Sequence, residues 1–473
     1  MSKKPLENND STTEIVESKG INAFVLVFIV VAVAAILTYI MPAGQYERQE
    51  VDGRSVVDPA TFTFIESTPA SFMDLFNSIH LGMLEGSGII FFVFIVGGAF
   101  GILKTTGALE AFVKVIALKF SDRATILIPI LMLFFAAGGT LMGMAEETLV
   151  YIGILVPLAL ALRFDVFTGF AIVSLGASVG FSAAVMNPFT VGVAQGVAEL
   201  PLFSGMGLRL ALLATLYVAA VWYVTRHAKK VRANPSLGFY GRYDRETIVS
   251  VIDEDFKIST RHKLVLYTFL LNFIVLIYGV IKLDWYITEI AGLFLLFGIL
   301  IGFIGKISSS NIADSFIDGA KEILPGALII GVAQAILVIF KNGSLMDTIL
   351  YYASNMIDSL PPVLSAIGIF IFQLFFNFLI PSGSGQAALT MPIMAPLGDL
   401  IGVTRQTTVL AFQLGDGMSN IIFPTVGFFM AGLAMAGIPW TRWVKWVFPF
   451  FLIQIGIAVV FLIIAQLTQY GPF

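Results

Sequence analysis

The sequence predicts an all-α polytopic membrane protein in which two inverted repeats each hold a re-entrant helical hairpin and a broken transmembrane helix. Three observations lead to this fold class: the apolar composition, a series of long uncharged runs, and short motifs that recur in the same order in both halves of the chain. Of the 473 residues, 58% are hydrophobic and only 12% are charged. A soluble domain is about one quarter charged, so we expect most of this chain to lie in lipid.

The uncharged runs predict membrane-spanning helices. Most of them match or exceed the roughly 18–20 apolar residues that cross a bilayer as a helix. They lack the period-2 alternation of barrel strands, and a helix satisfies its own backbone hydrogen bonds in lipid. The runs cover residues 21–41, 86–103, 124–145, 166–198, 264–281, 323–340, 359–398 and 446–473.

The charges of the polar segments between the uncharged runs predict how the chain is oriented in the membrane. Residues 226–263 carry nine Lys/Arg against five acids, so by the positive-inside rule this basic loop is cytoplasmic. Residues 42–70 carry more acids than bases and are expected outside. The polar tail 1–20 precedes the first helix, 21–41, without a small-residue cleavage site, so we expect a cytoplasmic N-terminus and a retained helix. A helical bundle of this kind is expected in a bacterial inner (plasma) membrane.

Five short motifs match in order between the halves. Repeat 1 is predicted at 71–225 and repeat 2 at 311–467, with the basic loop and two connecting helices, 264–306, between them. Because the first repeat begins outside and the second inside, the repeats are inverted, as in secondary carriers. The matching pairs are 106–109 with 342–345, 133–135 with 374–376, 156–158 with 395–397, 175–176 with 414–415, and 190–192 with 425–427.

Each repeat has one stretch that is too long for a single helix: 124–162, which is uncharged except for Glu146 and Glu147, and the uncharged run 359–398. We interpret the stretches 124–162 and 359–402 as hairpins that enter the membrane from opposite sides and turn back at small residues. A broken helix follows each hairpin. The breaks are predicted at Asn187 and Pro188 within 166–198, and at 415–424 within 406–437, because proline removes a hydrogen-bond donor and clashes with the preceding turn.

Two motifs carry a resemblance to a known family. The sequence PSGSGQAA at 381–388 is followed by MPIMAP at 391–396, and FQLGDGMSNIIFP spans 412–424. On these motifs the chain resembles the YfcC/DcuC-type carriers of the ion-transporter superfamily, which are related to the AbgT and dicarboxylate/sodium symporter families. The resemblance implies a homodimer whose protomers each have a scaffold and a transport domain that moves as an elevator. Members are described either as basic amino-acid (arginine/ornithine) antiporters or as C4-dicarboxylate carriers, so the resemblance leaves the substrate open.

The second hairpin tip is a candidate site for a substrate carboxylate or an ion. Hairpin tips expose backbone N–H and C=O groups at membrane depth, where lipid penalises an unsatisfied group. Hydroxyls, an amide and a helix N-terminus meet there. The alternative is that Gly and Ser only allow close helix packing. The candidate residues are Ser382, Gly383, Ser384, Gly385 and Gln386.

Buried acids form the other candidates. Glu146 and Glu147 are predicted in the opening turn of the second arm of the first hairpin, where one of them, Glu146 in preference, would neutralise a substrate amine or carry a proton. Acids also favour helix N-termini without any further role. Asp416 is predicted in the broken helix near mid-membrane, where carboxylates are functional by default. The residues expected beside it are Gln413, Ser419, Asn420 and, at the matching break, Asn187.

The implied ligands are small. Na⁺ near Ser384, Asp416 and Asn187, or H⁺, is the expected coupling ion, with no other cofactor. Nothing in the net charge of −4 suggests nucleic acid. Neither a Walker A motif nor an HExxH motif occurs, which argues against an ATP-driven protein and a metalloprotease, and we expect no enzyme activity. Because neither hairpin nor break contains Lys or Arg, the acids favour a basic or zwitterionic amino acid as substrate, moved by antiport or ion-coupled uptake. A C4-dicarboxylate carrier and, more remotely, a membrane enzyme or channel are the alternatives.

Overall fold

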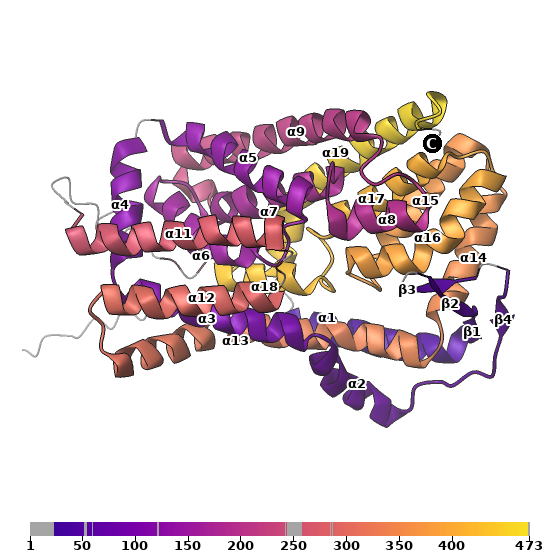
Figure 1. Ribbon diagram of the computed structural model, residues 1–473, viewed down its shortest axis with the longest axis horizontal. Helices are drawn as coiled ribbons and strands as arrows, with labels where there is room; N and C mark the ends of the chain where they lie inside the picture. The colour runs from indigo at the N-terminus through magenta and orange to yellow at the C-terminus, as the bar shows by residue number, and fades with distance from the viewer. Residues whose placement is uncertain are drawn as a thin grey trace, which may run out of the picture.

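In the computed structural model the chain forms an elongated bundle whose helices mostly run along its long axis (Figure 1). The structure describes residues 23–51, 54–58, 60–120, 123–241, 243, 258–283, 285 and 287–471. The predicted tail 1–20 and most of the second half of the basic loop lie outside these ranges. Among the described residues, six helices are long and apolar enough to cross a membrane, or seven if α13 is counted despite a 42° bend near Pro325.

One layer of the bundle is organised around α13 (Ser309–Asn342), and we call it the α13 layer. Helix α13 packs against α1, α2 and α3, and α3 packs against α12. Glycines bring α3 and α13 together: a methyl group on Gly319 would lie 2.3 Å from the Gly97 carbonyl oxygen, which is the close approach that small residues permit between membrane helices. The other helices of the layer are α1 (Ala23–Ile40), α2 (Phe72–Glu85), α3 (Ser87–Thr105), α11 (Thr260–Leu283) and α12 (Ile287–Ile304).

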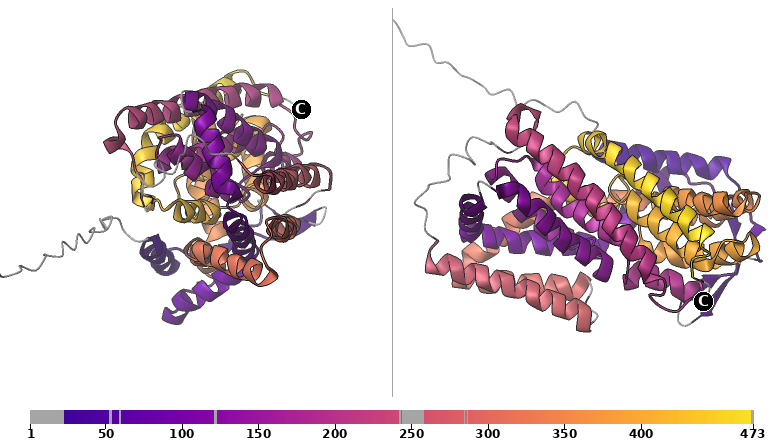
Figure 2. Two further views of the ribbon diagram at one scale, coloured as in Figure 1. Left: turned by 90° about the vertical axis from the view of Figure 1, so that its left-hand side faces the viewer. Right: turned by 90° about the horizontal axis from the view of Figure 1, so that it is seen from above.

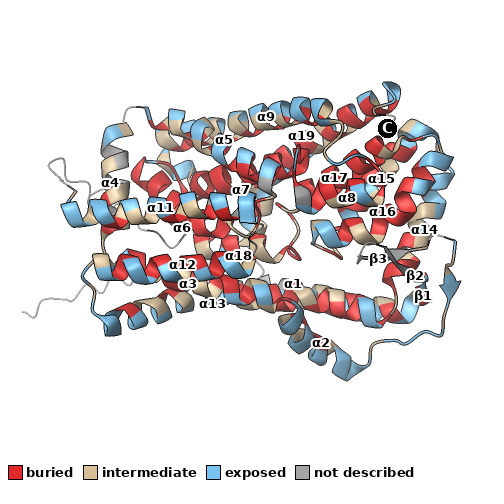
Figure 3. Ribbon diagram, viewed as in Figure 1, coloured by how far each residue is buried: buried red, intermediate tan, exposed pale blue. Residues whose placement is uncertain are grey.

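The second and larger group of helices surrounds α7 (Val166–Ala183) and α17 (Arg405–Ser419). Both helices are buried along almost their whole length (Figure 3). They cross each other closely, since a methyl group on Gly417 would lie 2.7 Å from Ser182 Cα. Helices α9 (Met206–Ala233) and α19 (Trp440–Leu467) pack against this pair and against each other (Figure 2). The crossing of α7 and α17 is therefore the core that positions the site.

The predicted hairpins are pairs of helices joined by short turns. The first pair is α5 (Ala124–Met142) and α6 (Thr148–Ala161), and the second is α15 (Pro362–Phe376) and α16 (Gly383–Leu400). We call the turns 143–147 and 377–382 the first and second tips. In Figure 1 the two pairs lie toward opposite ends of the bundle. Two further helices, α4 (Ala108–Phe120) and α14 (Met346–Asp358), also lie at opposite ends.

The first helix break lies close to its predicted position. Helix α7 ends at Ala183, and after residues 184–187 a π-helical turn, Pro188–Gly192, leads into α8 (Val193–Val197). The break begins three residues before the Asn187–Pro188 pair that predicts it. Asn187 itself caps the turn, because its Oδ1 accepts a hydrogen bond from the Phe189 N–H at 2.9 Å.

The second break does not begin where the glycines predicted it. Helix α17 continues through Gly415 to Ser419, and only 420–426 separate it from α18 (Gly427–Ala436). Gly415 and Gly417 serve close packing instead: a methyl group on Gly415 would lie 2.7 Å from the Leu374 backbone nitrogen. The prediction of an interruption from residue 415 was therefore wrong, because these glycines accommodate neighbouring helices rather than end this one.

A buried polar cluster fixes the beginning of α7. Asp165 accepts hydrogen bonds from Thr168 N (3.0 Å) and Oγ1 (2.6 Å), from Phe239 N (3.0 Å), and from His227 Nε2 (3.0 Å). Trp446 Nε1 donates to His227 Nδ1 at 3.1 Å, so the imidazole is neutral and carries its proton on Nε2. The cluster joins α7 to α9, to α19 and to the chain after the 3₁₀ turn Pro235–Leu237.

The segment after α1, treated as a loop in the sequence, contains two small antiparallel sheets. Strand β1 (Gly44–Gln45) pairs with β4 (Thr63–Phe64), and β2 (Arg48–Val51) pairs with β3 (Arg54–Val57). We call residues 43–64 the strand segment. It is attached to α14 and also contacts α16 through β3.

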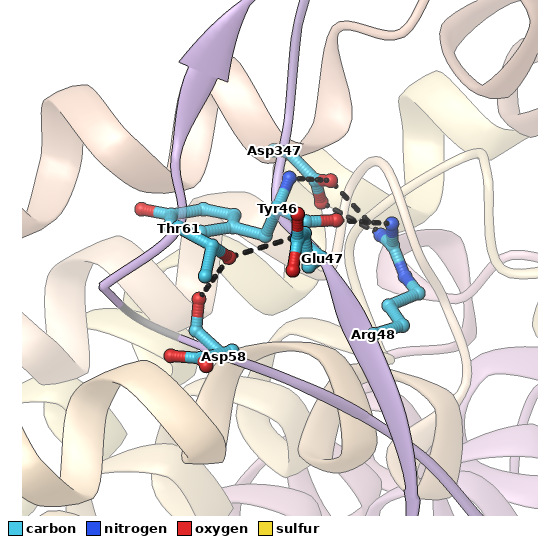
Figure 4. A network of polar contacts seen from close by, with 6 residues as sticks. All are labelled: Tyr46, Glu47, Arg48, Asp58, Thr61 and Asp347. Atoms are coloured by element: carbon cyan, nitrogen blue, oxygen red, sulfur yellow. Dashed lines mark hydrogen bonds and ion pairs between the residues drawn. The ribbon is translucent and has the colours of Figure 1, made fainter.

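An ion pair holds the strand segment on α14 (Figure 4). Arg48 Nη2 lies 2.8 and 3.0 Å from the two carboxylate oxygens of Asp347, and Tyr46 N donates to the same carboxylate at 3.0 Å. Phe62 stacks on Tyr351 with ring centroids 4.0 Å apart. The Asp347 side chain is only 5% exposed, so this contact is the main polar attachment that the structure describes for the segment.

Replacing Asp347 with Asn should loosen the strand segment. The substitution removes the charge that faces Arg48, and hydrogen bonds to charged groups contribute about 1.5–3 kcal/mol. Because the Arg48 side chain is 42% exposed, solvent screens the ion pair. We therefore expect the free energy that holds the segment on α14 to fall by about 1 kcal/mol. Amide hydrogen exchange over 43–64 should then be roughly fivefold faster. The exposed pair of Asp318 with Lys321 offers the control Asp318→Asn. Unchanged exchange in Asp347→Asn would show that the ion pair does not hold the segment.

Candidate functional site

The central feature of the candidate site is a carboxylate buried in the last turn of α17. Asp416 is only 1% exposed, and neither of its carboxylate oxygens has a hydrogen-bond partner among the described residues. A charge buried in the membrane interior is costly unless something compensates it. Asp416 therefore requires a cation or a proton to compensate its buried carboxylate.

The second tip supplies the nearest structure to this carboxylate. A methyl group on Gly383 would lie 3.1 Å from Asp416 Oδ2 and 2.4 Å from Thr190 Cγ2. Gly383 is the first residue of α16, and Ser382 caps that helix by accepting from Gly385 N at 3.3 Å. The positive end of the α16 dipole therefore lies beside Asp416, which favours the ionised carboxylate.

Further polar groups near Asp416 are buried without hydrogen-bond partners in the described structure. They include Thr190 Oγ1, Ser182 Oγ and Gln413 Oε1. Ser182 Oγ lies 2.9 Å from the position of a methyl group on Gly417, and Gln413 is held on α7 by the bond from its Nε2 to Phe181 O at 2.8 Å. We call Thr190, Gly383 and Asp416 the Asp416 site, while Ser182 and Gln413 lie where α17 meets α7.

Asn187 and the acids of the first tip make other contacts. Asn187 contacts the first tip, since a methyl group on Gly143 would lie 2.6 Å from its Oδ1. Glu146 and Glu147 fall in the turn just before α6, which begins at Thr148, and not in its opening helical turn as predicted. The Glu147 carboxylate accepts from Ala145 N at 3.1 Å. No hydrogen bond or ion pair described by the structure joins either acid to Asp416.

The other predicted residues divide between the tip and the end of α17. Ser382, Ser384 and Gly385 are exposed. Gln386 is buried and donates through Nε2 to Gln373 O at 2.8 Å and Oε1 at 2.7 Å. Ser419 and Asn420 face a residue that the sequence analysis missed, Asn377 in the second tip.

Asn377 braces the C-terminal end of α17. Its Nδ2 lies 2.7 Å from Ser419 Oγ, 2.7 Å from Asn420 Oδ1 and 3.1 Å from Asp416 O. The signal was available, because Asn377 is a buried amide at the end of the apolar run that precedes the second tip. Gln373 and Thr390, which bond to each other at 2.9 Å, were missed for the same reason.

A cavity lies on the other side of α17. It lies between the first tip, α7 and the second break, and its volume is about 30 Å³, roughly that of one water molecule. We call it the central cavity. Gly417 lines it, whereas the neighbouring Asp416 faces Gly383. Its polar lining is limited to Thr148, Ser174, Ser178 and Asn420, and no charged side chain lines it. The other lining residues are apolar.

The two places suit different ligands. The Asp416 site is closely packed around one carboxylate and neutral oxygens, which suits a proton or a monovalent cation. Asp416 and Thr190 each have an unpartnered oxygen to offer to a cation such as Na⁺. The central cavity, at about 30 Å³, lies well below the roughly 300–1,000 Å³ of small-molecule sites, so it has room for a water molecule and not for an organic one.

Comparison with known proteins places the chain in a family. Residues 22–467 match the family model "DcuC: C4-dicarboxylate anaerobic carrier". A protein of Escherichia coli (strain K12), "Putative basic amino acid antiporter YfcC", is 35% identical over 466 residues, which cover 90% of this chain and 92% of that protein. An uncharacterized protein of Haemophilus influenzae (strain ATCC 51907 / DSM 11121 / KW20 / Rd) is 31% identical over 427 residues, which cover 88% of this chain and 83% of that protein.

Among solved structures, the YdaH transporter of Alcanivorax borkumensis aligns with a TM-score of 0.43 and 14% identity, over 95% of this chain and 100% of that one. The assignment rests on the sequence matches, which extend over nearly the whole chain. The chain therefore belongs to the DcuC family of membrane carriers, and it is a transporter and not an enzyme.

Proposed function

We propose that the protein is a secondary active transporter of amino acids, and that transport is coupled to a small cation bound by Asp416. The observation that carries the proposal is the buried carboxylate of Asp416, whose oxygens have no partner in the described structure. A cationic or zwitterionic substrate is supported by the acids Glu146 and Glu147 in the first tip. The printed name of the E. coli relative, a basic amino acid antiporter, agrees with this substrate class.

Packing around Asp416 favours Na⁺ or H⁺ over a substrate amine as its immediate partner. Gly383 is so close to Thr190 and Asp416 that one added methyl group would collide with Thr190. An organic ammonium carries a bulkier substituent than that methyl group. A proton or a dehydrated monovalent ion fits beside the carboxylate without moving α16.

A C4-dicarboxylate carrier is the second candidate, because the family model carries that description. Its two carboxylates would need positive partners. Neither the Asp416 site nor the central cavity contains Lys or Arg. The N-terminal end of α16 with Ser382 and Ser384 is the one feature beside the site that would attract a carboxylate. A single helix end can bind one of the two carboxylates of a dicarboxylate and leaves the other without a positive partner. The buried acids, in contrast, supply a counter-charge for the amine of an amino acid.

The arrangement also supports inverted repeats and an elevator movement. Helices α4 and α14 follow α3 and α13 in the two halves, and the order hairpin, broken helix and long helix is the same after each. We propose that the α13 layer is the scaffold, that the group around α7 and α17 moves as the transport domain, and that two protomers associate in the bacterial inner membrane with their N-termini in the cytoplasm.

Asp416→Asn should abolish cation coupling. The amide keeps the shape of the side chain but removes the charge that binds the ion. Truncating one side of a buried charge pair typically costs 2–5 kcal/mol, so we expect uptake into proteoliposomes to fall more than roughly tenfold. The dependence on sodium should vanish if the ion is Na⁺, and the dependence on pH should vanish if it is H⁺. Asp318→Asn, at an exposed ion pair, is the control. Normal uptake with unaltered ion and pH dependence in Asp416→Asn would refute the proposal.

Two neighbouring glycines test the close approach of the second tip. Gly383→Ala places a methyl group 2.4 Å from the stiff side chain of Thr190, whereas Gly385→Ala meets only Ser382 Oγ at 3.1 Å. Overpacking typically costs 1–3 kcal/mol, so the first substitution should weaken ion-dependent binding at least roughly fivefold and the second should leave it within about twofold. Equal effects of both substitutions in a binding assay would remove Gly383 from the site.

The orientation can be tested by labelling, because the chain has no cysteine. Leu237→Cys lies in the basic loop and Glu66→Cys follows the strand segment, and both positions are exposed. A membrane-impermeant maleimide added to intact cells should label the cysteine at 66 and spare the one at 237, since the positive-inside rule puts the basic loop in the cytoplasm. Labelling at 237 alone would reverse the proposed topology.

A further inference from the structure

A buried arginine without a counter-charge lies near the beginning of α9. Arg209 is the fourth residue of that helix and is only 1% exposed. None of the ion pairs among the described residues includes it, and its Nε has no hydrogen-bond partner there. A guanidinium cannot be neutralised by losing a proton in a protein, so its burial without an anion is strongly unfavourable.

The position of this arginine at a helix N-terminus adds to its need for an anion. The N-terminal end of a helix presents backbone N–H groups and the positive end of the dipole, which stabilise acids and disfavour cations. Residues 198–205 connect α8 to α9, and we call them the α8–α9 turn. Arg405 donates to Ala198 O in this turn and is paired with Glu199 at 2.7 Å and Asp399 at 2.9 Å. Arg209 lacks any such acid.

The oxygens around Arg209 are already used by other donors. Arg209 Nη2 donates to Ser204 O, and Gln195 Nε2 donates to the same carbonyl at 3.0 Å. Gln406 Nε2 donates to Ser204 Oγ. The oxygens of the two glutamines accept as well, Gln195 Oε1 from Phe203 N at 2.6 Å and Gln406 Oε1 from Gln195 Nε2 at 3.2 Å. The cluster therefore has more donors than acceptors, and an anion would supply the acceptor that Arg209 Nε lacks.

This cluster is separate from the Asp416 site and lies near the surface. Gln406 and Asp416 are both on α17, at positions about 15 Å apart along the helix axis. The α8–α9 turn that carries Ser204 is exposed beside it, since Leu202 is 62% exposed. An ion that displaces the Ser204 carbonyl from the guanidinium can therefore reach Arg209 from that surface.

We propose that Arg209 is the centre of a binding site for a small monovalent anion, namely chloride or the carboxylate of an organic molecule. The anion accepts hydrogen bonds from the guanidinium, and the N-terminal end of α9 adds to its attraction. Gln195 continues to donate to Ser204 O when the anion takes the place of that carbonyl on Arg209. The site is additional to the cation site at Asp416, and the inference does not depend on the substrate that the protein carries.

The test is the melting temperature of the full chain, purified in detergent, in different anions. Chloride or acetate replaces the bulky sulfonate of HEPES at constant sodium concentration and ionic strength. A ligand that binds only the folded state raises the melting temperature, so we expect a saturable rise with chloride, with acetate or with both. A rise with chloride alone identifies an inorganic anion as the ligand, and a rise with acetate alone identifies a carboxylate.

Substitutions of Arg209 then locate the binding. Arg209→Gln removes the charge, so the rise with anion should disappear. In HEPES alone this variant should melt at the same temperature as the unaltered protein or higher, because an unpaired buried charge has been removed. Arg209→Lys keeps the charge but loses the planar fork of donors, so the affinity for the anion should fall at least roughly fivefold. Arg226→Gln, at an exposed arginine of the same helix, is the matched control and should keep the full response.

Three outcomes would overturn the anion site. The first is a melting temperature that does not depend on the anion. The second is an Arg209→Gln variant that responds to anions as the unaltered protein does and melts lower in every buffer, which would show that Arg209 only holds the α8–α9 turn. The third is an unchanged anion affinity in Arg209→Lys, which decides the question even where Arg209→Gln fails to fold. None of these outcomes affects the cation coupling, which Asp416→Asn tests separately.

Discussion

The satisfaction of backbone hydrogen bonds inside a membrane is the constraint on which this structure depends. Each helix break leaves N–H and C=O groups that lipid cannot satisfy. At the first break, Val185 N donates to Thr140 Oγ1 at 3.0 Å and Met186 N donates to Thr140 O at 3.1 Å. At the second, Asn377 binds the end of α17. Each hairpin therefore completes the broken helix that follows it, and neither element is complete without the other.

The crossing of α7 and α17 joins these two units and gives them a way to influence each other. Asp416 faces the second tip from one side of α17, and the next residue, Gly417, lines the central cavity on another side. A ligand that displaces α17 from α7 changes both places at once, because packed helices shift as units. Coupling between a cation at Asp416 and a ligand elsewhere in the group around α7 and α17 then requires only that both ligands prefer the same position of α17.

The sequence predicts the two helix pairs and the first helix break that the structure contains, because long runs of few charges interrupted by small residues and proline have few other solutions in lipid. It cannot tell a glycine that ends a helix from one that admits a neighbour, which is why Gly415 and Gly417 were misread. Asn377 was not predicted as a site residue, because its role depends on hydrogen bonds to residues about forty positions away in the chain. The same limit applies to Glu146 and Glu147, whose position relative to Asp416 depends on tertiary packing. The strand segment was missed because short strands fixed by one ion pair have little pattern of their own.

The contact between the two groups of helices is of a kind that permits sliding. Helix α18 provides most of the contact with α13, and at Gly427 it meets the side chain of Ile330, whose Cγ2 would lie 3.0 Å from an added methyl group. An apolar contact without specific geometry is nearly as favourable after a shift as before it, because area burial is non-directional. The far end of α7, in contrast, is fixed to α9 and α19 by the directional bonds of Asp165, His227 and Trp446. The elevator movement that we propose would require directional bonds inside one group of helices and an apolar contact between the two groups.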